Sequence, residues 1–106
     1  MDKKAVLIII DRFRQALEAR QIRINKLILF GSYAHGVPKE ESDIDLIVIS
    51  DDFEDKGFWA RIEILSDAIF ELFEPIEALA MTPAEWAAGG SDRVYLAEGS
   101  EVVYAA

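Results

Sequence analysis

Two short apolar runs, within residues 26–30 and 43–50, limit the fold of this 106-residue chain more than any other feature. Both runs have the length of buried strands. The stretches 2–20 and 58–73 instead repeat apolar residues at intervals of three and four, which is typical of amphipathic helices. A third apolar stretch, 76–80, continues the alternation of helix and strand. The pattern predicts an α/β fold in which helices flank a small mixed β-sheet.

The last quarter of the chain carries clear helix boundary signals. Thr82-Pro83-Ala84-Glu85 supplies an N-cap residue, a proline at the first helical position and a capping-box acid. Gly89-Gly90 should end that helix, and Ser91 is placed to cap a further one that runs to about Glu98. The apolar residues 102–104 then predict an edge strand.

Both long helices carry more apolar residues than one buried stripe requires. In the first, Leu7 and Ile8 widen the stripe, and we interpret them as buried in preference to forming a docking surface. In the second, helical spacing is shared by Phe58, Ile62, Leu65, Ile69 and Phe73, and we assign the aromatic residues to the core.

Two acidic residues lie at the start of the second predicted strand. Because residues i and i+2 of a strand point to the same face, Asp43 and Asp45 should project together while Ile44 and Leu46 enter the core. Carboxylate oxygens are ligands for hard divalent cations. Exposed strand ends often carry two acids, however, so this pair indicates a site only together with its surroundings.

Those surroundings include Gly31-Ser32, which ends the first predicted strand. Gly31 permits close approach of the backbone, and Ser32 with the following amides can donate hydrogen bonds to phosphate oxygens at a helix N-terminus. Residues 33–35 should form one helical turn there. A phosphate cradle facing a pair of carboxylates predicts metal-dependent nucleotidyl transfer, since phosphate charge must be neutralised by cations.

The sequence Gly-Ser-Tyr-Ala-His-Gly at 31–36, followed by Ser-Asp-Ile-Asp-Leu at 42–46, resembles the minimal nucleotidyltransferases of the polymerase-β-like superfamily. The resemblance implies the polymerase-β-like core, with a third acidic residue on a strand beside the Asp-x-Asp strand. Glu77 matches this position, where aspartate is more usual.

The resemblance also implies roles for these residues in an attack by an acceptor hydroxyl on the α-phosphorus of ATP. Asp43, Asp45 and Glu77 would hold Mg²⁺, with two ions expected, and Glu77 would receive the hydroxyl proton. Gly31 and Ser32 would position the β and γ phosphates.

The length of the chain suggests what else the reaction needs. We expect 1–106 to form a single minimal nucleotidyltransferase domain, with no separate substrate-binding domain. A partner protein or a second copy, in a homo-oligomer, should supply the missing surface. Resemblance to stand-alone members implies the antitoxin of a toxin–antitoxin pair, which transfers AMP to a tyrosine of a helical HEPN-type ribonuclease.

Charge and composition exclude several other functions. The chain has 20 Asp and Glu against 11 Lys and Arg, a formal net charge of −9, so direct binding to nucleic acid is disfavoured. It has no cysteine and hence no disulfide framework, and its apolar runs are far too short for a membrane span. We expect a cytoplasmic protein.

Two alternatives stay open at this stage. The fold could serve as a binding module that neutralises a partner sterically, with little or no catalysis. Alternatively, the nucleotidyl group could pass to a small cationic molecule with a hydroxyl, which would suit the acidic surface.

Overall fold

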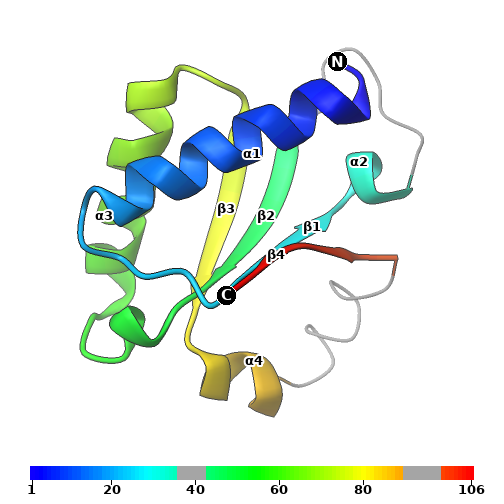
Figure 1. Ribbon diagram of the computed structural model, residues 1–106. Helices are drawn as coiled ribbons and strands as arrows, with labels where there is room; N and C mark the ends of the chain where they lie inside the picture. The colour runs from blue at the N-terminus through cyan, green and yellow to red at the C-terminus, as the bar shows by residue number, and fades with distance from the viewer. Residues whose placement is uncertain (36–42, 90–98) are drawn as a thin grey trace.

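The computed structural model describes residues 1–35, 43–89 and 99–106 (Figure 1). The elements within these residues follow one another as α1 (Lys3–Glu18), β1 (Lys26–Phe30), α2 (Ser32–His35), β2 (Ile44–Ile49), the 3-10 turn η1 (Asp51–Phe53), α3 (Phe58–Leu72), β3 (Ile76–Met81), α4 (Pro83–Ala88) and β4 (Glu101–Ala105). The helix expected at 91–98 lies outside the described residues.

The four strands form one mixed sheet in the order β3-β2-β1-β4. β1 is antiparallel to both β2 and β4, whereas β2 and β3 run parallel and are joined through α3 (Figure 1). The predicted mixed sheet is therefore confirmed, and so is the edge strand near the end of the chain. β3 forms the other edge.

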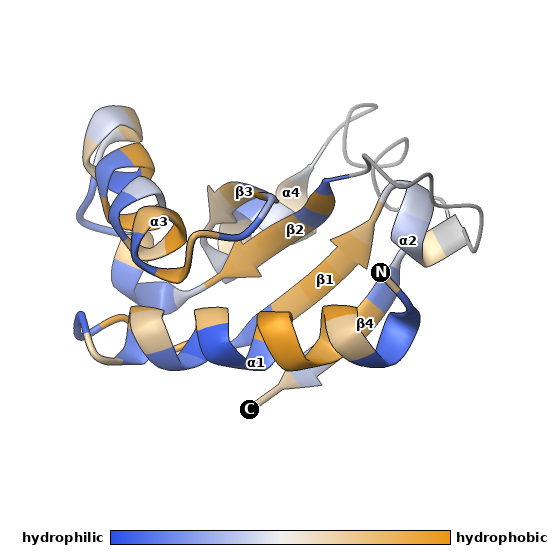
Figure 2. Ribbon diagram, turned by 90° about the horizontal axis from the view of Figure 1, so that it is seen from above, coloured by the Kyte–Doolittle hydropathy of each residue, from blue (hydrophilic) through white to orange (hydrophobic). Residues whose placement is uncertain are grey.

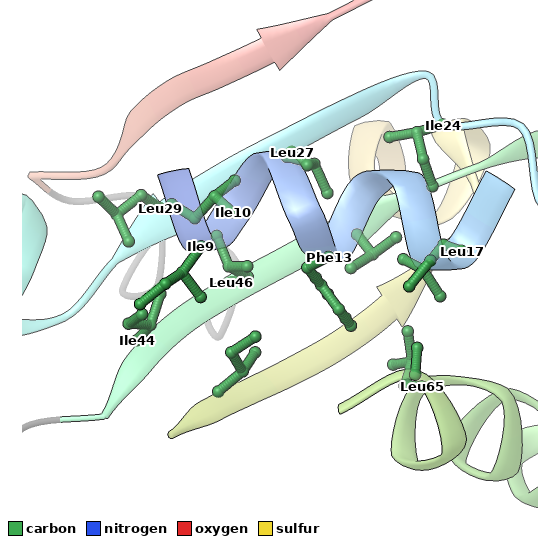
Figure 3. Packing of buried hydrophobic residues seen from close by; sticks show 14 of the residues in the cluster. Ile9, Ile10, Phe13, Leu17, Ile24, Leu27, Leu29, Ile44, Leu46 and Leu65 are labelled. Atoms are coloured by element: carbon green, nitrogen blue, oxygen red, sulfur yellow. The ribbon is translucent and has the colours of Figure 1, made fainter. Parts of the chain in front are cut away.

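The main core lies between the sheet and the pair α1 and α3. α1 runs across one face of the sheet, and Phe13 and Leu17 point from it toward the strands (Figure 3). Leu27 and Leu46 meet them from β1 and β2, which Figure 2 shows as almost entirely hydrophobic. Burying these side chains supplies the main driving force for folding.

The structure corrects the burial expected for the outer residues of α1. The helix begins after Asp2, whose carboxylate accepts a hydrogen bond from the Ala5 N–H at 2.8 Å. It packs on the sheet through a single stripe. Leu7 and Ile8 lie about 100° and 200° around the helix from the buried Val6, and they are 40% and 56% exposed. Their assignment to the core is wrong.

A larger correction concerns α3. Leu65 and Ala68 are its buried residues, whereas Phe58 is 67% exposed and Phe73 is 88% exposed. The assignment of these aromatic residues to the core is therefore wrong. The reason is the rotation of the helix: α3 faces α1 and the sheet with the side that carries Ala68, and the aromatic side turns to the surface.

The capping box predicted at the start of α4 is present and yields a stability prediction. The Thr82 hydroxyl accepts from the Glu85 N–H at 3.0 Å, and the Glu85 carboxylate accepts from the Thr82 N–H at 2.8 Å. We expect Thr82→Ala to lower the free energy of unfolding by about 1 kcal/mol, because it leaves a helix N–H without its acceptor. Thr82→Ser keeps the hydroxyl and removes only the buried methyl group, so its loss should be smaller. Urea denaturation measures both, and equal losses would contradict the capping role.

None of the helices in the described part of the chain combines the length and apolar character that crossing a bilayer requires.

Candidate functional site

The candidate site lies on the sheet face turned away from α1 and α3. Alternation along β2 places Ile44 and Leu46 in the main core, and both are fully buried. Asp45 therefore shares the opposite face with Ile47, which belongs to a smaller apolar cluster. The sequence predicted this division of β2, in which apolar residues hold the strand and an acidic residue projects from it.

β3 brings the third acidic residue to the same place. In the parallel pairing of β2 and β3, Glu77 is the register partner of Asp45. This confirms the expectation that the strand of Glu77 lies beside the Asp-x-Asp strand. Asp43 directly precedes β2 and is exposed, as is Glu77. Of the three acidic residues, Asp45 has the least contact with solvent.

The pKa of Asp45 reflects this crowding. It is raised above its ordinary value, mainly because burial disfavours the charged carboxylate. The negative charges of Glu77 and then of Asp43 raise it further, and so does a side-chain hydrogen bond with Glu77. The site is thus a region of concentrated negative charge, which a cation would relieve.

The backbone of Gly31, which follows β1, borders the site next to Asp45. Its φ of +72° is in the left-handed region, and a Cβ at this position would lie 2.1 Å from Asp45 Oδ2. The glycine backbone therefore lies directly against the Asp45 carboxylate. The pairing of Phe30 with Asp45 in the β1–β2 ladder explains this proximity, since Gly31 is the next residue along the chain.

α2 begins immediately after Gly31, as the sequence predicted for one helical turn. Ser32 is its first residue and is half-buried. Tyr33 packs into the main core at 4% exposure, and its hydroxyl has no hydrogen-bond partner within the described residues. Periodicity did not single out this buried hydroxyl, because a tyrosine at a packing position has an ordinary apolar role.

The donor set fits a hard divalent cation. Asp43, Asp45 and Glu77 offer only carboxylate oxygens, the ligand type that Mg²⁺ prefers, and Gly31 leaves the space beside Asp45 free of a side chain. Within residues 1–35, 43–89 and 99–106, no three acidic or histidine side chains are grouped closely enough to form a ready-made coordination shell. Coordination by all three carboxylates together would therefore require the exposed ones to move.

Comparison with known proteins assigns the chain to a family. Residues 10–83 match the family model of the nucleotidyltransferase domain, a range that contains Gly31, Ser32, Asp43, Asp45 and Glu77. The chain belongs to the nucleotidyltransferase domain family.

Three known proteins resemble this chain, one in sequence and two in fold. "Putative protein adenylyltransferase MJ0604" of Methanocaldococcus jannaschii is 51% identical over 47 residues, which are 42% of this chain and 47% of that protein. The chain spans about half the length of the curated relatives it matches.

The other two are solved structures. One is a "putative nucleotidyltransferase" from Sulfolobus solfataricus, with a TM-score of 0.69 and 17% identity over 92% of this chain and 78% of that one. The other is a toxin–antitoxin structure with AMP-PNP, with a TM-score of 0.64 and 18% identity over 91% of this chain and 73% of that one. At these identities the likeness shows the fold alone.

Proposed function

We propose that this chain is a Mg²⁺-dependent protein adenylyltransferase that moves AMP from ATP to a tyrosine hydroxyl of a HEPN-type toxin and so acts as an antitoxin. The observation that carries the proposal is the pairing of Asp45 with Glu77 on adjacent strands, with the Gly31 backbone against Asp45. Support comes from the family, from a relative named as a protein adenylyltransferase and from a structural neighbour described as a toxin–antitoxin with AMP-PNP.

The reaction follows from what these residues offer. The acceptor oxygen forms a bond to the α-phosphorus of ATP, the bond from that phosphorus to the bridging oxygen of the β-phosphate breaks, and pyrophosphate leaves. Glu77 is the candidate acceptor for the hydroxyl proton, because it is exposed at the rim of the site. Asp43, Asp45 and Glu77 would hold the magnesium, which supplies charge neutralisation for the phosphates when bound.

Gly31 and Ser32 would orient the leaving group. Gly31 lets the chain turn sharply from β1 into α2, and backbone N–H groups at the start of α2 can donate to phosphate oxygens. Because the same turn contacts Asp45, the phosphates and the carboxylates would be held in one fixed relation. We place the reaction in the cytoplasm, where ATP is available.

The first test is the intact mass of a co-expressed partner. The chain is expressed together with its neighbouring gene, and the mass of any small protein that co-purifies is compared between the wild type and Asp43→Asn/Asp45→Asn. We expect whole AMP increments on a tyrosine of the partner with the wild type and none with the variant. A stable complex whose partner is unmodified in both cases would refute adenylyl transfer.

A binding module is the second candidate, and the exposed aromatic side of α3 favours it. In that case Asp43→Asn would leave neutralisation of the partner unchanged. In the enzyme, the same variant should lose neutralisation while partner binding persists. Growth rescue from the toxin and affinity co-purification, measured on the same variant, separate the two candidates.

A further inference from the structure

Four aromatic side chains of α3 and its C-cap lie open to solvent. Phe58, Trp59, Phe70 and Phe73 are 67%, 77%, 81% and 88% exposed. With about 200 Å² on each aromatic side chain, they present on the order of 600 Å² of apolar surface. That is the upper end for a patch on a monomer and close to what one partner contributes to an ordinary protein interface.

Two of these residues, Trp59 and Phe73, belong to a stripe with a recognisable repeat. Residues 59, 62, 66, 69 and 73 are spaced three, four, three and four apart, which is the repeat that keeps a seam facing another helix. We define the outer stripe by these positions together with two flanking phenylalanines: Phe58, Trp59, Ile62, Ser66, Ile69, Phe70 and Phe73. Its length of about 22 Å corresponds to four helical turns.

The outer stripe continues into a groove at its N-terminal end. A hollow of about 550 Å³ lies between α3 and the edge strand β3, and its lining includes Phe58, Ile62 and Ala78. The hollow is mainly apolar, with Lys56, Arg61 and Glu85 also in its lining, and it has room for a large side chain from a docked helix.

Along the flank of α3 next to Phe70 the charges are acidic. Glu63 and Asp67 are exposed on the side of α3 next to Phe70, and neither carboxylate forms an ion pair with another described residue. Arg61 is the one basic residue in α3, and it is turned inward. Its guanidinium donates to the Glu85 carboxylate at 2.6 Å and to the Phe53 carbonyl at 2.7 Å.

This charge distribution favours a basic partner helix over a second copy of the chain. Two copies of α3 packed together would bring their acidic flanks close, on chains that each carry a net charge of −9. A helix with lysine or arginine beside its apolar stripe would instead meet Glu63 and Asp67 with opposite charge.

We propose that the outer stripe of α3 binds an amphipathic helix of a partner protein, with apolar residues in a three-four repeat and basic residues along its flank. The inference rests on the proposed function, since it names the surface that holds the acceptor protein. The stripe lies on the α1 and α3 side of the sheet, so docking there leaves the face of Asp45 open. The stripe ends at Phe73, four residues before Glu77, which brings the partner to the edge of the site.

Two synthetic peptides test the surface directly. Both are helical, have leucine in the three-four repeat and span about four turns. One carries lysine at its flanking positions and the other glutamate. By fluorescence polarisation of the labelled peptide, we expect the wild-type chain to bind the lysine peptide at least tenfold more tightly than the glutamate peptide.

A pair of variants separates the stripe from general attraction by the acidic chain. Trp59→Ser/Phe70→Ser keeps the net charge and replaces two exposed side chains, so it should fold and should weaken the lysine peptide at least tenfold. Val102→Ser, at a 55% exposed position of β4, serves as the matched control and should bind as the wild type does. Equal binding of the lysine peptide to all three proteins, or equal affinity for both peptides, would overturn the proposal.

Two further outcomes also count against it. If sedimentation shows a wild-type dimer that Trp59→Ser/Phe70→Ser abolishes, the occupant is a second copy. If that variant still adenylylates the co-expressed partner at the wild-type rate, the acceptor docks elsewhere and the inference fails while the proposed function stands.

A partner that binds through the stripe but gains no AMP refutes the proposed function and leaves the docking surface intact.

Discussion

Asp45→Asn is expected to lower the rate of adenylyl transfer by about 10²- to 10³-fold while the chain stays folded. Asp45 is the least exposed of the three acidic residues, and it lies between its register partner Glu77 and the backbone of Gly31. Asparagine has almost the same shape, so packing is preserved. It cannot supply the negative charge that a divalent cation requires.

The rate is measured as transfer of labelled AMP to the co-expressed partner under single-turnover conditions. Asp55→Asn provides the control, because Asp55 is an exposed acidic residue outside the site that pairs with Lys56. Its rate should equal that of the wild type. Equal losses in the two variants would show that overall negative charge, and not the position of Asp45, matters for the reaction.

Asp45→Asn should also change the thermal stability of the chain, and this effect does not depend on catalysis. Because the pKa of Asp45 is raised in the folded chain, the folded state binds a proton more tightly than the unfolded state does. Ionisation of Asp45 therefore destabilises the fold as pH rises through the window between the ordinary aspartate pKa and the raised one. At pH 7 with a chelator present, Asp45→Asn should melt at a higher temperature than the wild type. Below that window the advantage should disappear.

The sequence predicted correctly those parts of the fold that depend on strong local patterns. The division of β2 into a core side with Ile44 and Leu46 and a site side with Asp45 is a direct result of strand alternation. The capping box at Thr82 is equally local. That Glu77 would lie beside Asp45 came from the family resemblance, since periodicity does not determine which strands pair.

The orientation of α3 could not be predicted because the helix carries two apolar stripes with helical spacing. The predicted stripe runs through Phe58, Leu65 and Phe73, and of these three only Leu65 is buried. The second stripe is the one around Ala68. Hydrophobicity alone favours burying the aromatic stripe. Packing reverses this choice, because the small side chain of Ala68 lets α3 approach the sheet and α1 closely, which bulky rings would prevent.

Gly31→Ala is expected to lower adenylyl transfer by about 10²-fold and the free energy of unfolding by about 1–2 kcal/mol. The loss of stability comes from the φ of +72°, which an L-residue adopts at a cost. The loss of activity has a different origin. The new Cβ would lie 2.1 Å from Asp45 Oδ2, so the carboxylate at the end of its short side chain must turn away from its position beside Glu77.

Two controls separate the loss of stability from the loss of activity. One is Gly57→Ala, and the other is Gly31→Ala combined with Asp45→Ala. Gly57 is the N-cap of α3, has φ −77° and would place no atom within 4 Å of an added Cβ. Because alanine caps a helix less well than glycine, Gly57→Ala should lower the free energy of unfolding by no more than about 1 kcal/mol, and it should leave transfer intact. In an Asp45→Ala background, Gly31→Ala should retain its stability cost, because the backbone strain remains when the carboxylate is gone. If that cost instead disappears, the methyl–carboxylate clash and not the left-handed backbone is what requires glycine at this turn.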